Sequence, residues 1–235
     1  MPRKTAILTS LVVAATALFT MDAVRPVAQT RTVEVLFLGH TSQHHNSGKY
    51  QPILAEALKP ENINFTYTTD LADLNPEKLS KYDALMIYAN HSKITPEQEK
   101  ALLDYVAGGK GFLPIHAASY CFQNSPAYIE LVGAQFMKHG TGEFTTEFVK
   151  TDHPVMAGMK PFQVWDETYV HTKINPDKIV LMERVDANGR EPWTWVRTHG
   201  KGRVFYTAYG HDDRVWSNPN FHLLMKNAVR WATGR

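Results

Sequence analysis

The chain of 235 residues carries 25 basic and 23 acidic residues, and its formal net charge of +2 is spread along the sequence without runs. This balance predicts no nucleic-acid-binding surface. The one cysteine, Cys121, excludes an internal disulfide and a cysteine-rich zinc site. Beyond an N-terminal segment about 205 residues remain, enough for one large α/β domain with a substantial core.

Residues 1–30 differ in composition from the rest of the chain. The positive start MPRK precedes the apolar run AILTSLVVAATALF, and small residues follow at Ala23 and Ala28. This order predicts a signal peptide, and therefore a periplasmic or extracellular protein. The alternative is an uncleaved anchor, but the run is short for a membrane span of about 20 residues. We therefore expect export of a single domain, residues 31–235, with no other membrane segment.

From Thr32 onward, short apolar runs alternate with helical patterns. Strands are predicted at VEVLFLG (33–39), INFTYTT (63–69), ALMIYAN (84–90) and GFLPI (111–115). Helices are predicted over SGKYQPILAEALKP (47–60) and TPEQEKALLDYVAGG (95–109). Strands buried on both faces and separated by helices indicate a parallel, doubly wound sheet.

The second half of the chain has more β character. Strands are predicted at GEFTTEFVK (142–150), QVWDETYV (163–170), KIVLMER (178–184), PWTWVRT (192–198) and GRVFYTAYG (202–210). A final helix is predicted from about Asn220 to Thr233. The whole pattern predicts a three-layer α/β fold with a doubly wound, mostly parallel sheet of the flavodoxin-like kind. VEVLFLG, ALMIYAN, GFLPI and GRVFYTA are expected in one central sheet.

Histidines recur at the ends of the predicted strands. Four of the eleven follow a strand directly, namely His40, His91, His116 and His211. Two further segments add candidates. FMKHG offers His139, expected in the turn between a helix and the next strand, and WDETYVH offers Glu167, Tyr169 and His171. Because parallel strands end at one edge of a sheet, where ligands bind, we expect these side chains to gather in one cleft.

Five motifs in this order carry a resemblance to a known family. They are GKGFLPIHAAS, GAQFMKHG, WDETYV, GKGRVFYTAYGHDDRVW and LLMKNAVRWA. The chain resembles the ThuA-like family, named for trehalose utilisation, from Val33 to Gly234. The resemblance implies a fold similar to class I glutamine amidotransferases and a polar pocket made by His40, His116, His139, Glu167 and His211. The chain departs from the family at its start, where His44 and His45 enrich the first loop.

Class I amidotransferases place a cysteine nucleophile at the turn that follows the strand equivalent to GFLPI. Here that position is His116, while Ser119 and Cys121 lie three and five residues further on. The sequence therefore argues against a glutaminase. A neutral imidazole at this position can bind a divalent metal or act as a general base near neutral pH.

Three histidines and one carboxylate form a nitrogen and oxygen donor set that suits zinc or a similar divalent transition metal. The candidate ligands are His116, His139, Glu167 and His211. His116, Glu167 and His211 are also the candidate catalytic residues, with Glu167 or His116 as base. In a metal-free alternative, an imidazole contacts Glu167 directly and acts in acid/base catalysis. No nucleotide cofactor is expected.

Aromatic residues near the candidate site suit the flat apolar faces of sugar rings. Trp216 is the candidate for stacking on a sugar, whereas Trp193 and Trp195 alternate on a strand and are expected in the core. The candidate substrate-binding residues are His40, Tyr169, Asp212 and Trp216.

The resemblance implies a role in disaccharide breakdown in which a partner dehydrogenase makes a 3-keto sugar. The predicted function is processing of such oxidised glycosides by His/Glu acid/base chemistry, assisted by a metal or not, through isomerisation, elimination or hydrolysis. Two-carboxylate glycoside hydrolysis fits less well, because only one strong candidate carboxylate is present. The alternative from another class is an exported carbohydrate-binding module without catalysis.

Overall fold

A nine-stranded sheet organises the domain, in the spatial order β2-β1-β3-β4-β9-β8-β7-β5-β6. The computed structural model describes residues 1–2, 31–187 and 189–235. The chain separates into two units, Met1–Thr30 and Arg31–Arg235, and the sheet belongs to the second. The predicted signal peptide lies outside the described residues apart from its first two positions.

Five strands make the parallel half of the sheet. They are β1 (Val33–Gly39), β2 (Ile63–Thr68), β3 (Ala84–Tyr88), β4 (Gly111–Pro114) and β9 (Gly202–Thr207). β1, β3 and β4 are almost wholly buried, as their continuous apolar sequences require. The four segments expected in one central sheet therefore lie in it, with their carboxyl ends at the same edge.

Four further strands extend the sheet in antiparallel fashion. They are β5 (Gln135–Phe148), β6 (Gln163–Thr172), β7 (Ile179–Asp186) and β8 (Gly189–His199). The predicted α/β class is confirmed, and the β-rich second half of the chain makes the sheet mixed, with its parallel part confined to β2, β1, β3, β4 and β9.

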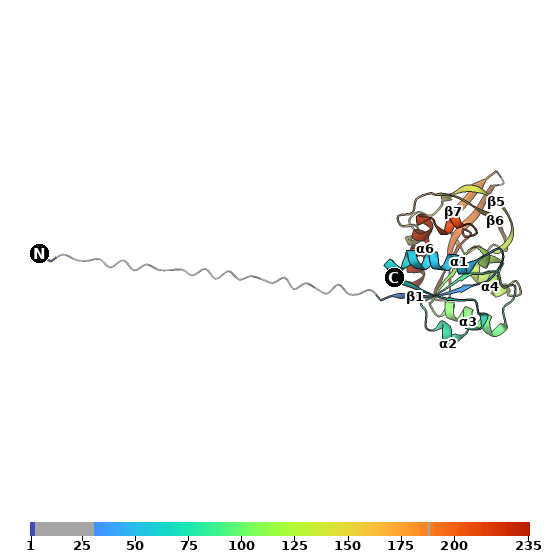
Figure 1. The fold of residues 1–235 in the computed structure, drawn as a ribbon, viewed down its shortest axis with the longest axis horizontal. Coiled ribbons are helices and arrows are strands. Elements are labelled where there is room, and N and C mark those ends of the chain that lie inside the picture. The colour runs from blue at the N-terminus through green and yellow to red at the C-terminus, as the bar shows by residue number, and fades with distance from the viewer. Residues whose placement is uncertain (3–30, 188) are drawn as a thin grey trace. The chain divides into compact units, whose positions relative to one another are not determined.

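Helices form the outer layers. The α-helices are α1 (Ser47–Leu58), α2 (Pro76–Leu79), α3 (Pro96–Ala107), α4 (Pro126–Val132), α5 (Asp213–Trp216) and α6 (Pro219–Thr233). Short 3₁₀ helices span Lys59–Glu61, Leu71–Asp73, His116–Tyr120 and Pro154–Met156. Figure 1 shows α1 and α6 on one side of β1, and α2 and α3 on the other. α6 contacts β3, β4 and β9, while α3 contacts α2, α4 and β9, which completes the three layers.

Local sequence sets the helix ends. Thr95 caps α3 in a capping box with Gln98, and Pro96 stands at the first helical position. α6 begins one residue before the predicted Asn220, because Asn218 is its N-cap and Pro219 its first residue. These caps hold the helices that cover the sheet.

β5 differs most from the prediction. It begins at Gln135, seven positions before the predicted strand start at Gly142, and pairs with β6 almost continuously across the glycine-containing segment. The HGTG sequence suggests a turn, but its glycines remain in the ladder. His139 therefore lies within a strand, opposite Tyr169, and not in a turn after a helix.

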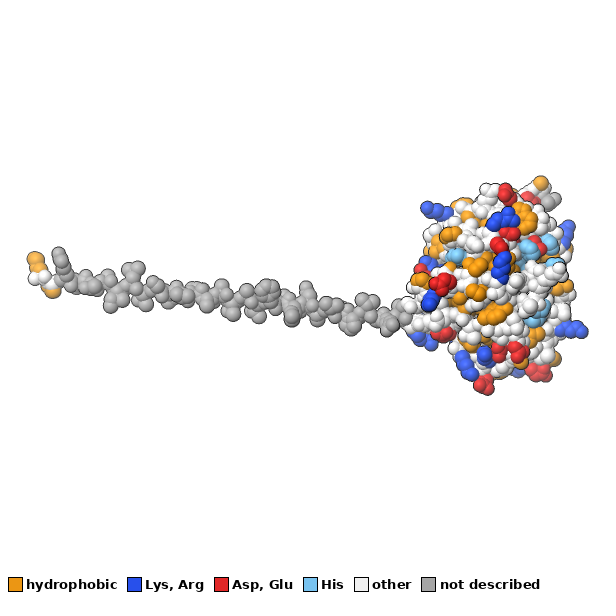
Figure 2. All heavy atoms as spheres, viewed as in Figure 1, with side chains coloured by type: hydrophobic (Ala, Val, Ile, Leu, Met, Phe, Trp, Pro, Cys, Tyr) orange, Lys and Arg blue, Asp and Glu red, His pale blue; other side chains and the backbone are white. Residues whose placement is uncertain are grey.

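The surface agrees with the even charge of the sequence. Figure 2 shows acidic and basic side chains interspersed over the visible face of the domain, with apolar side chains between them. Among the residues that the structure describes, no helix is long and apolar enough to span a membrane.

Gly202, the first residue of β9, lies very close to the backbone at the end of α3 and before β4. A Cβ there would approach the carbonyl oxygen of Val106 to 2.0 Å and that of Lys110 to 2.7 Å, whereas a Cβ at Gly142 meets nothing within 4 Å. We expect Gly202→Ala to lower the free energy of unfolding by about 3 kcal/mol, because these are backbone atoms. Gly142→Ala should change it by less than about 0.5 kcal/mol. Urea denaturation of both variants measures the difference, and equal stabilities would contradict it.

Candidate functional site

His116 stands at the carboxyl end of β4, at the first residue of the 3₁₀ helix that follows. Its backbone is left-handed, with φ of 49°, a strained conformation for a residue with a side chain. The hydroxyl groups of Ser119 and Tyr206 donate to its carbonyl oxygen at 3.0 and 3.1 Å. Its Nδ1 donates to the carbonyl of Ala208 at 2.7 Å, so the buried ring is fixed in orientation.

β6 contributes two adjacent carboxylates. Because successive side chains of a strand point to opposite faces, Asp166 and Glu167 face different surroundings. Asp166 is fully buried and accepts backbone N–H groups from Gly210 at 2.9 Å, His211 at 2.9 Å and Asp212 at 3.1 Å. Burial raises its pKa to about 6. Asp166 thereby ties the loop after β9 to β6.

Glu167 faces the histidines. Its Oε2 lies 3.1 Å from Nε2 of His116, and its Oε1 lies 3.2 Å from Nδ1 of His211 and 3.6 Å from Nδ1 of His139. Burial alone would raise the pKa of Glu167, but the hydrogen bond and charge of His116, with the charges of His211 and His139, lower it to about 2. Glu167 is therefore an ionised carboxylate at neutral pH.

His211 follows β9, on the loop that Asp166 holds. The carbonyl of Gly210 accepts from the Tyr88 hydroxyl at 2.8 Å and from the Trp216 indole at 2.7 Å, which fixes the loop from its other side. Burial lowers the pKa of His211. Its Nδ1 lies beside Glu167 without an aligned hydrogen bond to any described group.

His45 completes the cluster from the loop between β1 and α1. Its ring centroid lies 5.2 Å from that of His116 and 5.5 Å from that of His211. The side chain is buried, and neither ring nitrogen has a hydrogen-bond partner among the described residues. Burial, followed by the charge of His116, lowers its pKa to about 3. His45 is not among the candidate ligands predicted from the sequence. The adjacent histidines His44 and His45 in the first loop are the feature that could have indicated it.

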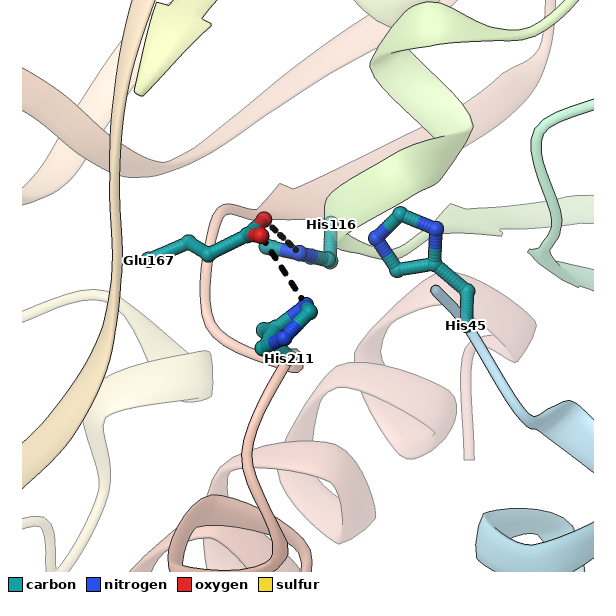
Figure 3. Close-up of side chains that lie close together, drawn as sticks. All are labelled: His45, His116, Glu167 and His211. Carbon is teal, nitrogen blue, oxygen red and sulfur yellow. Dashed lines mark hydrogen bonds and ion pairs between the residues drawn. The ribbon is translucent and has the colours of Figure 1, made fainter. Parts of the chain in front are cut away.

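One ligand atom from each of His45, His116, Glu167 and His211 lies within 4.8 Å of all the others. Figure 3 shows the three imidazoles and the carboxylate converging from four separate segments. Since Nδ1 of His116 donates to a carbonyl, Nε2 of the neutral ring presents a lone pair to the Glu167 carboxylate. That contact needs a cation, either a proton or a metal. Three nitrogens and one oxygen form a donor set that fits zinc or a similar ion.

His139 occupies a different place from the other predicted ligands. Its side chain is 40% exposed, and its Nδ1 donates to the carbonyl of Gly140 at 3.1 Å. It lies near Glu167 but outside the tight cluster, where His45 stands instead. The structure thus brings together three of the four predicted ligands and places the fourth at the edge.

The remaining candidate histidines, His40, His91 and His171, have contacts of their own. Nδ1 of His40 donates to Oδ1 of Asn90 at 2.5 Å, and the rings of His40 and His91 are 4.0 Å apart. His171 is buried between Glu191, at 2.9 Å from Nδ1, and the hydroxyl of Tyr206, at 3.0 Å from Nε2. None of these three histidines belongs to the group of four donors that lie within 4.8 Å of one another.

The proposed stacking role of Trp216 is wrong. Trp216 is fully buried, stacks on Tyr50 at 5.0 Å, and is held by its bond to Gly210, so no sugar can reach its face. Asp212 is the N-cap of α5 and pairs with Arg214, so a structural role accounts for its side chain. Tyr169 does line the pocket, and its ring stacks on His116 at 4.1 Å.

A pocket of about 420 Å³ opens beside Glu167. Its polar lining residues are His44, His45, Asn90, His139 and Glu167, and its aromatic ones are Tyr120, Phe136 and Tyr169. A cavity of this size with a few converging polar groups among aromatic faces suits a small organic molecule.

The fold is an α/β fold of the flavodoxin and class I glutamine amidotransferase-like kind, with a cluster of histidines and one carboxylate at the carboxyl edge of its parallel strands. The profile of the family described as ThuA, trehalose utilisation, matches residues 34–232. The chain therefore belongs to the ThuA family, which indicates a role in carbohydrate metabolism.

Solved structures share the fold. A ThuA-like protein from Bacteroides uniformis superposes with a TM-score of 0.72 at 23% identity, covering 88% of this chain and 95% of that one. A second, from Parabacteroides merdae, gives 0.73 at 18% identity, covering 86% and 90%. A β-galactosidase from Bacillus circulans sp. alkalophilus gives 0.62 at 14% identity, covering 86% of this chain and 31% of that enzyme. A search of curated proteins returns no match.

The loop that carries His211 should depend on Asp166. Asp166→Ala leaves one buried and two partly buried N–H groups without their acceptor, and we expect a loss of about 3 kcal/mol in the free energy of unfolding. Asp212→Ala, the matched control, removes a helix cap and should lose about 1 kcal/mol. Chemical denaturation gives both values, and NMR signals of the histidine rings report whether His211 moves. A smaller loss for Asp166→Ala than for Asp212→Ala would contradict this role.

Proposed function

We propose that this protein is an exported enzyme that processes 3-keto glycosides, with His45, His116, Glu167 and His211 holding a divalent transition metal and His139 carrying protons. The single observation that carries the proposal is the contact between Nε2 of His116 and the carboxylate of Glu167, 3.1 Å apart, which needs a cation. Membership of the ThuA family supports a sugar as the substrate.

The donor geometry favours a metal over a proton in this cluster. A single proton between His116 and Glu167 leaves both buried nitrogens of His45 and Nδ1 of His211 without a partner. One cation at the centre of the four side chains satisfies an atom of each of them. The bond from Nδ1 of His116 to the Ala208 carbonyl is the outer contact that commonly orients a metal-bound imidazole.

A 3-ketone makes the neighbouring C2 proton acidic. When bound, a divalent cation supplies Lewis acidity toward the carbonyl oxygen of the substrate. A base removes the C2 proton, the C1–O glycosidic bond breaks as a C1=C2 double bond forms, and the leaving oxygen takes up a proton. Addition of water at C1 then completes hydrolysis, and reprotonation without loss of the leaving group gives isomerisation.

His139 is placed to move these protons. Its Nδ1 donates to the carbonyl of Gly140, so Nε2 of the neutral ring is free to accept a proton. The side chain is partly exposed at the pocket, close to Glu167. We assign to His139 the transfer of the proton from C2 to the leaving oxygen, while a metal held by the four cluster residues would polarise the sugar carbonyl.

One feature of the sequence and one of the substrate chemistry support the cellular setting. The apolar run after a basic start supports export, and therefore action in the periplasm or outside the cell. A 3-keto glycoside requires an oxidation step before this one, so a sugar dehydrogenase is the expected partner in the pathway.

Metal content tests the cluster. We expect the purified protein to contain a stoichiometric divalent transition metal by elemental analysis. Glu167→Gln and His45→Ala should each lower metal affinity by roughly 10- to 100-fold or more, because the first removes the negative charge of a ligand and the second removes a donor nitrogen. His139→Ala, the matched control, should retain the metal. A wild-type protein that converts its substrate without bound metal would contradict the proposed metal site and favour metal-free acid/base catalysis.

Turnover tests the reaction. The protein should be incubated with native and 3-keto disaccharides in D₂O, and products followed by mass spectrometry and NMR. We expect conversion of the 3-keto sugars alone, with deuterium entering at C2. His139→Ala should lower kcat by roughly 100-fold, the usual range for loss of an acid/base group. Sugar binding without turnover would contradict the proposed enzymatic function and favour a carbohydrate-binding module.

A further inference from the structure

Four aromatic rings contact one another in sequence from the floor of the pocket to its rim. The ring of His116 stacks on Tyr169 with centroids 4.1 Å apart, Tyr169 contacts Phe136 at 4.5 Å, and Phe136 contacts Tyr120 at 5.8 Å. Exposure rises along the series, from the buried His116 and Tyr169 to Tyr120, which is 39% exposed. We name Tyr120 and Phe136 the rim pair.

The rim pair is held by regular structure. Tyr120 is the last residue of the 3₁₀ helix that begins with His116, and Phe136 lies at the start of β5. Tyr120 is therefore placed by the same short helix as the cluster histidine. A large aromatic ring left partly in solvent at the mouth of a pocket is available to a ligand.

His139 lies at the boundary between the floor and the rim. Its ring centroid is 5.9 Å from that of Phe136 and 6.0 Å from that of Tyr169, and its Nδ1 is 3.6 Å from Glu167. A sugar whose reacting carbons meet Glu167 and His139 places its glycosidic oxygen near His139. The group attached to that oxygen then extends toward the rim pair.

We propose that the rim pair is a subsite for the second pyranose ring of a disaccharide, whose apolar C–H face stacks on Tyr120 and Phe136. This inference rests on the proposed function, and it adds to that function a binding site for the part of the substrate beyond the glycosidic oxygen. Neighbouring polar groups of Asn90 and His44 in the same pocket can pair with the hydroxyls at the edge of the ring.

The test compares two substrates that differ only beyond the glycosidic oxygen, 3-keto-trehalose and methyl 3-keto-α-glucoside. Loss of one aromatic face in Tyr120→Ala should lower the ratio of their kcat/KM values roughly three- to tenfold, through KM for the disaccharide. Tyr120→Phe keeps the ring and should restore the ratio. Ile179→Ala, a control at an exposed apolar residue that does not line the pocket, should keep it.

A ratio that stays the same in Tyr120→Ala would overturn the subsite even if both substrates are converted. Failure to convert either substrate would overturn the proposed function instead. In that case calorimetric binding of trehalose and of methyl α-glucoside decides the inference. Tighter binding of trehalose, weakened roughly three- to tenfold in Tyr120→Ala, supports the subsite, and its absence overturns it. Thermal denaturation of each variant shows that it is folded.

Discussion

The buried carboxylate of Asp166 accepts three backbone N–H groups from the loop after β9, and this contact joins the two halves of the sheet. β6 is the last strand in the spatial order, four places from β9, yet one of its residues holds the β9 loop. The antiparallel part of the sheet therefore folds back over the carboxyl edge of the parallel part. Without this return, Glu167 on the edge strand β6 would stand four strand positions away from His211, which follows the central strand β9.

Two adjacent residues of β6, whose side chains lie on opposite faces of the strand, thus have two different roles. Asp166 fixes the backbone of the loop, and Glu167 meets the histidines that the loop and the β4 turn present. Burial raises the pKa of Asp166, whereas the surrounding histidines lower that of Glu167. The strained backbone of His116 belongs to the same arrangement, because a Cβ at Gly210, where φ is 141°, would lie 3.0 Å from that of His116. Two loops that must pass so closely leave room only for glycine.

Much of this geometry could be predicted, because parallel strands end at one edge whatever their distance in sequence. That rule led to His116 and His211, and the WDETYV motif led to Glu167. The rule did not identify His45, because that residue lies in a loop, where no periodicity marks its position. It also misplaced His139, because a segment with two glycines is typical of a turn, whereas here it is part of a strand. Trp216 follows a strand-end histidine and looked accessible, but a four-residue helix turns it into the core against Tyr50. Asp166 gave no signal at all, because its partners are backbone groups.

The four cluster residues come from four separate segments, and the nearest two in sequence, Glu167 and His211, are 44 positions apart. In the unfolded chain, no two of these four donors are close enough in sequence to chelate an ion together. Any metal that fills the cluster binds the native chain almost exclusively, so its binding free energy adds nearly in full to the resistance against unfolding. For a metal-loaded protein, chelators in the surroundings would then act as denaturants, and the supply of metal would set its lifetime.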